Sequence, residues 1–386
     1  MPWRWTPVHG RASAGDVVGT SEVVVVRVVV VGATGNVGTA VLRRLGTETA
    51  IDAISGIARR IPPPHAPLAN GRVDWQPIDI GLSGASAALT DAFAGAGAVI
   101  QLAWQIQPSH DRASIRRTNV KGASNVVKAA IAAKVPTLIV ASSVGAYSPA
   151  PKEPRVDEAW PATGVSGCAY SQDKAAVEAL LDGLEDERRE PRIVRLRPAL
   201  TFQRSAASEI ARLFVGPLAP LALLRFGRLP VVPSSHRLRL QATHADDVAD
   251  AYVRALLSDL RGALNIAAEP PLDAQSVAPR FGGRPVPMPP WLLRQAAALS
   301  WRFRLQPTEP GWIRLATGSP LMSCLRAETE LGWRPRISAL DALAELIDGL
   351  ADSANGATAP LRARPRAVAR LGALAQGRLP GHGNPY

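Results

Sequence analysis

The sequence predicts an α/β fold built on a doubly wound parallel sheet, with a smaller lobe in the C-terminal half. Up to about residue 205, short apolar runs rich in Val, Ile and Ala alternate with helical patterns. Near-continuous apolar strands separated by helices are typical of a parallel sheet that is buried on both faces. Beyond that point prolines interrupt the apolar segments 213–224 and 285–291, and this looser pattern predicts the smaller lobe.

Each element of the predicted sheet follows from its apolar pattern. Runs of four to eight β-branched and apolar residues predict strands at Val28–Val31, Ile51–Ala58, Val73–Ile78, Ala98–Ala103, Thr137–Ser142 and Ile193–Leu196. Longer patterns with helical periodicity predict helices at Val37–Leu45, Ser114–Ala133, Tyr170–Asp186 and Ala242–Leu257. Right-handed crossovers between parallel strands make the sheet doubly wound. Asp246 and Asp247, near the start of the last helix, are interpreted as a cap that complements the helix dipole.

The composition is that of a globular protein, because 47% of the 386 residues are hydrophobic and 20% are charged. The net charge is +12, but only five of the 44 basic residues are lysines. We attribute this arginine bias to codon usage and expect no nucleic-acid partner, since no zinc-finger or aromatic-interleaved basic motif is present. Cys168 and Cys324 make no disulfide framework and suit a reducing compartment. The six histidines lack ligand spacing, so no metal is expected.

No segment resembles a signal peptide or a membrane span. Residues 1–20 have no apolar core, and the run 23–31 is short and interrupted by Arg27. The run 213–224 is also too short to cross a bilayer and contains two prolines. We therefore expect a cytoplasmic protein that does not bind membranes.

A glycine-rich turn lies between the first predicted strand and the first helix. Its sequence, GATGNVG, spans Gly32–Gly38 and includes Gly32, Thr34, Gly35, Asn36, Val37 and Gly38. Glycines three residues apart allow a tight turn, a close approach to a pyrophosphate and close packing of the helix on the sheet. The helix N-terminus then presents N–H groups and a partial positive charge to the phosphates. The turn predicts a dinucleotide-binding site.

The end of the second predicted strand indicates which dinucleotide binds. An acidic residue there binds the ribose hydroxyls of NAD, whereas an arginine accommodates the 2′-phosphate of NADP. The strand ends at Ala58 and is followed by Arg59 and Arg60, without a carboxylate. Both guanidinium groups can pair with a phosphate bidentately. NADP is therefore favoured over NAD.

A tyrosine and a lysine lie four residues apart on the predicted helix 170–186. Tyr170 and Lys174 share one helix face at this spacing. A free phenol titrates near pH 10, and a pKa lower by about three units requires roughly 4 kcal/mol of preferential phenolate stabilisation, much of which a lysine in a partly dry site can supply. Ser143 follows a strand at the sheet edge where such sheets bind ligands, and Asn119 lies on the preceding helix. The four residues predict an acid–base site.

Taken together and in order, these motifs resemble those of the extended short-chain dehydrogenase/reductase family, also called the NAD-dependent epimerase/dehydratase family. The resemblance extends from about residue 24 to about residue 349 and implies a Rossmann sheet. Its landmarks are GATGNVG at 32–38, DI at 79–80, VIQLAW at 99–104, TNVKG at 118–122, SSVGAY at 142–147, YSQDK at 170–174, LRP at 196–198, THADDVADA at 243–251, GALNIA at 262–267 and ELGWRP at 330–335.

The resemblance implies a role for each matching residue. Tyr170 is the acid–base group that moves a proton to or from the substrate oxygen, and Ser143 hydrogen-bonds that oxygen. Lys174 holds the nicotinamide ribose and lowers the pKa of Tyr170, while Asn119 supports the lysine or a proton relay. Trp104 is a candidate substrate-facing residue. The implied cofactor-binding residues are Gly32, Thr34, Gly35, Asn36, Val37, Gly38, Arg59, Arg60, Asp79, Ile80, Leu102, Ala103, Lys174 and Pro198. Among these, Asp79 and Ile80 contact adenine and Pro198 lies beside the nicotinamide.

Several positions depart from the family pattern. Gln203 stands where a glycine is frequent. Many nucleotide-sugar members carry a phosphate-binding arginine at the position of Leu240, whereas here the arginine is Arg239, whose side chain would point to the opposite face of a strand. Sugar dehydratases carry an Asp-Glu pair where this chain has Val144 and Gly145. These departures disfavour nucleotide sugars and 4,6-dehydration.

We expect an NAD(P)-dependent oxidoreductase that transfers hydride at a secondary alcohol or ketone of a small-molecule substrate. A nucleotide-sugar epimerase that retains its NAD is the alternative. A non-catalytic NADP-sensing regulator is a third hypothesis, disfavoured because such regulators commonly lack the tyrosine and lysine. The resemblance also allows a homodimer, through the two helices that flank the active site.

The chain divides into four predicted parts. Residues 1–23 are expected to form a disordered extension, and 24–204 form the NAD(P)-binding Rossmann domain, to which 236–268 returns. Residues 205–235 and 269–350 are expected to form the smaller C-terminal lobe, which binds substrate. Residues 351–386 form a disordered basic tail.

Overall fold

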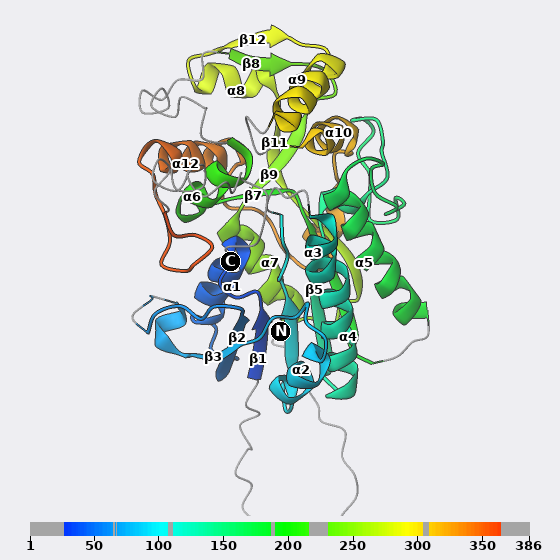
Figure 1. Cartoon of the computed structure of the whole chain (residues 1–386), viewed down its shortest axis with the longest axis vertical. Helices are drawn as coiled ribbons and strands as arrows, with labels where there is room; N and C mark the ends of the chain where they lie inside the picture. The colour runs from blue at the N-terminus through cyan, green and yellow to red at the C-terminus, as the bar shows by residue number, and fades with distance from the viewer. Residues whose placement is uncertain are drawn as a thin grey trace, which may run out of the picture.

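The computed structural model describes residues 27–64, 66, 68–106, 111–186, 190–215, 231–303 and 309–363 (Figure 1). The predicted extension 1–23 and most of the predicted basic tail lie outside these ranges. The described residues form a sheet layer at one end of the molecule and a lobe at the other.

The central sheet has seven parallel strands in the order β10-β6-β5-β4-β1-β2-β3. These strands are β1 Arg27–Val31, β2 Ala53–Ala58, β3 Val73–Pro77, β4 Ala98–Gln101, β5 Thr137–Ala141, β6 Arg192–Pro198 and β10 Gly262–Ile266. Val28 of β1 is in register with Ile54 of β2 on one side and with Ala98 of β4 on the other. The winding direction therefore reverses at β1, which confirms the predicted doubly wound sheet and opens a crevice between β1 and β4.

Helices cover both faces of this sheet. One face is covered by α1 Asn36–Leu45 and α7 Ala245–Leu256, and the other by α2 Ala85–Phe93, α4 Gly122–Ala132 and α5 Ala169–Asp186. The side chains of β1 alternate between the two cores: Val28 and Val30 pack under α1 and α7, whereas Val29 and Val31 pack under α2 and α4. Burial on both faces explains why the strands read as unbroken apolar runs.

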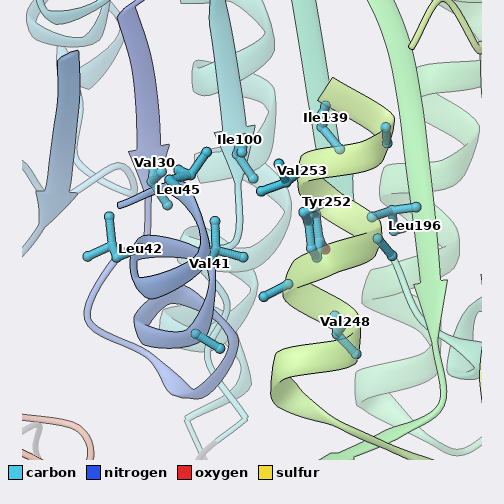
Figure 2. Close-up of a cluster of buried hydrophobic side chains, with 14 of the residues drawn as sticks. Val30, Val41, Leu42, Leu45, Ile100, Ile139, Leu196, Val248, Tyr252 and Val253 are labelled. Carbon is cyan, nitrogen blue, oxygen red and sulfur yellow. The ribbon is translucent and has the colours of Figure 1, made fainter. Parts of the chain in front are cut away.

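Figure 2 shows the core between the sheet and the helices α1 and α7. Strand residues such as Val30 and Ile139 meet Leu42 of α1 and Val253 of α7, and each of these side chains is buried. Burying one such aliphatic side chain contributes about 1.5 to 3 kcal/mol. Tyr252 of α7 is also buried in this core, and its hydroxyl has no hydrogen-bond partner among the described residues.

The predicted helix 114–133 is interrupted in the structure. It consists of α3 Arg112–Arg116, a π-helical turn at Arg117–Lys121 and α4. Single π-helical turns inside α-helices frequently mark functional sites, and this turn carries Asn119.

The helix predicted at 242–257 begins later, because Leu240–His244 forms strand β9 outside the central sheet. Asp246 and Asp247 lie in the first turn of α7, where they complement the helix dipole as predicted, but the side-chain cap is His244: its Nδ1 accepts a hydrogen bond from the Asp246 backbone N–H at 3.1 Å. The Asp246 carboxylate pairs with Arg43 at 2.6 Å.

The lobe contains two small sheets and several helices (Figure 1). Its strands are β7 Leu200–Phe202, β9 and β11 Ala268–Leu272, in the order β11-β9-β7, with β8 Val231–Ser234 paired to β12 Arg284–Pro287. Its helices are α6 Ala207–Ile210, α8 Ala274–Arg280, α9 Pro290–Arg302, α10 Pro310–Gly318 and α12 Ala339–Ala351. No helix within the described ranges is long and apolar enough to cross a membrane.

Three segments differ from the predicted division of the chain. Strand β7, predicted in the Rossmann domain 24–204, belongs to a sheet of the lobe. Of the returning segment 236–268, α7 and β10 join the sheet layer, but β9 belongs to the lobe. Trp333, which follows α11 Leu325–Thr329, was predicted in the lobe and instead lies in the core with α7, where its Nε1 donates to the Asp247 carbonyl oxygen at 2.8 Å.

The predicted tail begins too early at 351. Residues 352–363, which we name the C-terminal strap, fold back onto the glycine-rich turn. Thr358 and Leu361 are each only 1% exposed, and the Thr358 hydroxyl donates to the Thr34 carbonyl oxygen at 2.8 Å. The strap is ordered because these side chains find buried partners; residues 364–386 lie outside the described ranges.

Candidate active site

A groove runs along the carboxyl ends of β1, β2, β3 and β4, where doubly wound sheets bind ligands. It brings together residues that lie far apart in the sequence, because each follows the end of a parallel strand. Ten predicted site residues line it: Gly32, Thr34, Gly35, Arg59, Arg60, Asp79, Ile80, Leu102, Ala103 and Trp104.

The glycine-rich turn forms a cradle that only glycine permits. Gly32 has a φ of +84°, and a Cβ there would lie 2.4 Å from the backbone N of Ala103. A Cβ on Gly38 would lie 2.4 Å from the carbonyl oxygen of Gly32, so α1 can pack against the turn only without a side chain. Gly35, the N-cap of α1, lines the groove and has no side chain to cap the first N–H groups of the helix, as a pyrophosphate site requires.

We expect Gly38→Ala to destabilise the fold by about 1 to 3 kcal/mol, because the added methyl overpacks against backbone. Thermal unfolding and dinucleotide titration would measure the effect on stability and on binding. Gly183→Ala on α5 is the matched control: a Cβ there meets no described atom within 4 Å, so this variant should unfold no earlier than the parent. Equal melting temperatures for the two variants would contradict the prediction.

Five predicted cofactor residues, Asn36, Val37, Gly38, Lys174 and Pro198, are not among those that line the groove in the described structure. Val37 and Gly38 support α1 from the core side, and Pro198 ends β6 in register with Ile266. The Asn36 side chain faces β7, where its Nδ2 donates to the Thr201 carbonyl oxygen at 3.0 Å.

Gln203, which replaces a frequent family glycine, explains the orientation of Asn36. Its Nε2 donates to the Asn36 Oδ1 and carbonyl oxygen, each at 2.7 Å, and its Oε1 accepts from Arg43 at 3.0 Å. Gln203 thus ties the start of α1 to the lobe strand β7.

Basic side chains follow β2 and line the groove. With the Gln105 amide oriented so that its oxygen faces Arg59, the Arg59 guanidinium donates to it at 2.8 and 3.2 Å. Arg60 lines the same groove. Asp79 accepts from the Gly81 N–H at 2.9 Å, which fixes the turn after β3. No carboxylate follows β2 directly.

Tyr170, on the first turn of α5, meets Ser143, which follows β5. The Ser143 hydroxyl lies beside the Tyr170 phenol, and the Ser143 Oγ accepts a hydrogen bond from the Gly145 N–H at 3.0 Å. Burial raises the pKa of Tyr170 to about 12, although the neighbouring Ser143 hydroxyl acts to lower it. The phenol is therefore protonated at neutral pH.

Lys174 lies one turn after Tyr170 and is buried. Its Nζ donates to the Ala141 carbonyl oxygen at 2.8 Å and lies 3.6 Å from the centroid of the Trp104 ring. The same Nζ is 6.0 Å from the centroid of the Tyr170 ring, and burial lowers the pKa of Lys174 to about 7. The expected lowering of the Tyr170 pKa is not found, because loss of hydration dominates both groups.

Aromatic rings surround Tyr170. Trp104 meets it edge to face, with ring centroids 6.1 Å apart, and links the acid–base group to the groove that Trp104 itself lines. Trp312 of α10 stacks on the other side at 5.0 Å, and Phe214 packs against Trp312, also at 5.0 Å. The last two residues come from the lobe, and no motif in the sequence identifies them.

Asn119 supports the groove rather than the lysine. Its Oδ1 accepts from the Gln105 N–H at 2.8 Å, and its Nδ2 donates to the Gln105 carbonyl oxygen at 3.0 Å. The same Nδ2 lies 3.5 Å from Asp173. This pairing fixes the backbone next to Trp104, so Asn119 acts as a positioning residue in this structure.

A buried ion network lies one further turn along α5. Glu178 accepts from Arg197 at 2.8 and 2.9 Å, from Arg195 at 2.8 Å, and from the Ser142 hydroxyl. Burial alone would raise the pKa of Glu178, but these donors lower it to about 2. Its negative charge also favours the ammonium form of Lys174. The spacing of Tyr170, Lys174 and Glu178 on one helix face could have revealed this carboxylate from the sequence.

Three solved structures with the same fold align with this chain over nearly their whole length. A UDP-glucose 4-epimerase from Thermotoga maritima, solved with UDP-glucose, has a TM-score of 0.63 at 16% identity and covers 85% of this chain and 99% of that one. A UDP-glucose 4-epimerase from Thermus thermophilus in complex with NAD has a TM-score of 0.58 at 20% identity, and the alignment covers 84% of this chain and 98% of that one. A short-chain dehydrogenase/reductase superfamily protein from Agrobacterium tumefaciens with bound NAD has a TM-score of 0.59 at 19% identity, and the alignment covers 91% of this chain and 99% of that one. At these identities the likeness shows the fold.

None of the curated protein sequences compared with the chain matches it. The model of the NAD dependent epimerase/dehydratase family matches residues 28–267, more than half of the chain. That range holds the glycine-rich turn, Ser143, Tyr170 and Lys174 in the order that the sequence motifs predict. The chain therefore belongs to the NAD-dependent epimerase/dehydratase family of extended short-chain dehydrogenases/reductases.

Proposed function

We propose that this chain is an NAD(P)-dependent oxidoreductase that interconverts a ketone and a secondary alcohol, with Tyr170 as the acid–base group. The observation that carries the proposal is the Tyr170 phenol, which lies beside Ser143 and Lys174 and contacts, through Trp104, the groove that Trp104 lines. A structural tyrosine would not need a serine, a lysine and a ligand groove around it.

The residues present fit a nicotinamide dinucleotide, because Gly32, Thr34 and Gly35 line the groove at the N-terminus of α1 and the close backbone approach at Gly32 leaves no room for a Cβ. Such a cofactor, when bound, supplies or accepts the hydride. The chain's own hydroxyls manage the proton: Ser143 and Tyr170 both hydrogen-bond the carbonyl oxygen, and Tyr170 donates its proton as that oxygen gains charge. In alcohol oxidation Tyr170 accepts the proton instead. The free phenol is protonated at neutral pH, which is the form that donates the proton in carbonyl reduction.

Aromatic rings and the position of Arg239 support an apolar substrate. Trp104, Trp312 and Tyr170 present ring faces and edges where a substrate carbonyl would lie. Arg239, the arginine nearest to the phosphate-binding position of nucleotide-sugar enzymes, is paired with Glu153 at 3.3 Å and lies 3.9 Å from Asp273. A flat apolar or aromatic ketone therefore fits better than a sugar diphosphate.

A ketone-reduction assay tests this function. The purified chain is mixed with NADPH or NADH and a panel of aromatic, alicyclic and steroid ketones, and the loss of nicotinamide absorbance is followed. We expect steady turnover with at least one apolar ketone. No turnover across the panel, together with conversion of a UDP-sugar without net coenzyme consumption, would overturn the proposal.

The epimerase hypothesis keeps one specific support: the solved relatives include UDP-glucose 4-epimerases, one in complex with NAD. An epimerase returns the hydride to the same substrate and retains its cofactor, whereas a reductase releases it in each turnover. Acid release and chromatography of the purified chain would separate the two, because a stoichiometric bound dinucleotide is expected only for the epimerase. A cofactor-sensing regulator would bind dinucleotide and turn over neither substrate class.

The proposed preference for NADP rests on Arg59 and Arg60. We expect Arg59→Ala to weaken NADP binding by about 10- to 100-fold, the value of a hydrogen-bonded charged contact, and to leave NAD binding within about twofold. Titration of both dinucleotides by calorimetry measures this. Arg334→Ala, an exposed arginine outside the groove, is the control that should change neither affinity. Equal weakening of NAD and NADP by Arg59→Ala would remove Arg59 from the 2′-phosphate site.

A further inference from the structure

The groove has a second wall, next to the glycine-rich turn, that the family motifs do not cover. Glu209 of α6, Arg212 and Leu213 of the π-helical turn Ala211–Val215, and Pro360 of the C-terminal strap line it. They face the same groove as Gly32, Thr34 and Gly35. Two segments about 150 residues apart in the sequence therefore meet over the turn where the phosphates of a dinucleotide would lie.

Hydrogen bonds connect this wall to the glycine-rich turn. Arg212 Nη2 donates to the Pro360 carbonyl oxygen at 2.8 Å, and Thr358, two residues earlier, donates to the Thr34 carbonyl oxygen at 2.8 Å. The Arg212 guanidinium is thus linked to the turn through a stretch of three strap residues. The strap is also held from the lobe side, since the Ser208 hydroxyl donates to the Ala354 carbonyl oxygen at 2.7 Å.

The negative charge of a pyrophosphate favours an arginine at this position in the groove. A pyrophosphate carries two negative charges, while the N-terminus of a helix supplies only about half a positive charge. An arginine adds a full charge and can donate to two phosphate oxygens at once. Pro360 takes one N–H of the five that a guanidinium offers, which fixes the plane of the group and leaves further donors for a ligand.

We propose that Arg212 binds the pyrophosphate of the dinucleotide and that the C-terminal strap is the element that positions it. This inference rests on the proposed dinucleotide site and adds a binding residue from the lobe to it. Glu209, three residues before Arg212 and in the same groove, is the opposing group: burial raises its pKa to about 7, and in its ionised form it attracts Arg212 and repels an anion.

Arg212→Gln tests the assignment through its equal effect on two ligands. We expect binding of NAD and of NADP to weaken by the same factor, about 10- to 100-fold, because both dinucleotides contain the pyrophosphate. Arg59→Ala provides the contrast, since its effect should be confined to NADP. The exposed control Arg334→Gln should change neither affinity. Unchanged binding by Arg212→Gln, or a loss confined to NADP, would overturn the proposal. If the parent chain bound neither dinucleotide, the proposed function itself would fail.

The strap has its own test. A chain that ends after residue 352 should lose affinity as Arg212→Gln does, whereas a chain that ends after residue 363 should bind as the full chain does. In the shortened chain, Arg212→Gln should cause little further loss, because the two changes remove one interaction. Additive losses would show that the strap does not act through Arg212. Thr358→Val, which removes only the hydrogen bond to Thr34, should give a smaller loss of the same kind for both dinucleotides.

Glu209→Gln keeps the proposal testable if Arg212→Gln fails to fold. Removal of the opposing carboxylate should tighten binding of both dinucleotides several-fold. If Arg212 serves only as the structural partner of Glu209, the variant will instead melt earlier without tighter binding, and the assignment of Arg212 will be wrong.

Discussion

Tyr170→Phe should lower the rate of carbonyl reduction by about 10²- to 10⁴-fold, the usual contribution of a positioned proton donor. The change removes one hydroxyl and keeps the ring that packs between Trp104 and Trp312. Dinucleotide affinity should therefore remain within about twofold of the parent, because the cradle and Arg59 are untouched. Steady-state kinetics with the best ketone from the panel, together with calorimetric titration of the dinucleotide, would measure both quantities.

Tyr252→Phe is the matched control for this variant. Tyr252 is also a buried tyrosine, but it lies in the core between α7 and the sheet, and its hydroxyl has no hydrogen-bond partner among the described residues. Its removal should leave turnover unchanged and should not lower stability, since a buried unpaired hydroxyl is itself costly. A reductase that retained full activity after Tyr170→Phe would have a different proton donor. Loss of coenzyme binding in the same variant would make Tyr170 a structural residue.

The sheet was predictable because its strands are buried on both faces. Val28–Val31 reads as an unbroken apolar run for that reason, and the same holds for the strand predicted at 137–142. Elements whose stability comes from tertiary contacts were harder to predict. Helix α2 has the weak pattern ASAALTDAF and was not predicted, and β10, seen beforehand only as the motif GALNIA, completes the sheet beside β6. The cap of α7 depends on an imidazole orientation that no sequence pattern specifies.

The candidate site was predictable where residues follow strand ends. Gly32, Arg59, Asp79 and Ala103 come together because parallel strands present their carboxyl ends at one edge. Trp312 and Phe214 could not be predicted as site residues, because the lobe has no repeating apolar pattern that would show which of its side chains face the sheet domain. The direction of the Tyr170 pKa was predicted wrongly because motif spacing places a lysine nearby but says nothing about how completely both groups lose water.

Glu178→Gln should destabilise the fold by about 3 to 5 kcal/mol, the cost of leaving a buried charge without its partner. Arg197, of which 5% of the side chain is exposed, forms a two-point ion pair with Glu178 and would keep its charge in the core. Arg195 would be less affected, because it also contacts Asp182 at 2.5 Å. Chemical denaturation of parent and variant would give the difference in the free energy of unfolding. The double variant Glu178→Gln with Arg197→Met should recover part of the loss, since it removes both charges.

The dependence of the free energy of unfolding on pH, measured at acid pH, gives an independent measure of how strongly the fold stabilises the ionised Glu178. The pKa of Glu178 is about 2 in the folded chain and about 4.5 in an unfolded one, so the folded state favours the ionised form. The resulting stabilisation, about 3 kcal/mol, is fully present above pH 4.5 and is lost as the pH falls from about 4.5 to about 2. Glu178→Gln should flatten this part of the curve.

Asp182→Asn is the matched control, because it makes the same chemical change one turn further along α5. Asp182 contacts the same Arg195, but 61% of the Asp182 side chain is exposed. Water screens that ion pair, so the variant should cost no more than about 1 kcal/mol. Equal losses for the two variants would mean that burial does not decide the strength of this network. A large loss at Glu178 alone would show that α5, the helix that carries Tyr170 and Lys174, is fixed to β6 by a desolvated ion pair directly beneath the acid–base site.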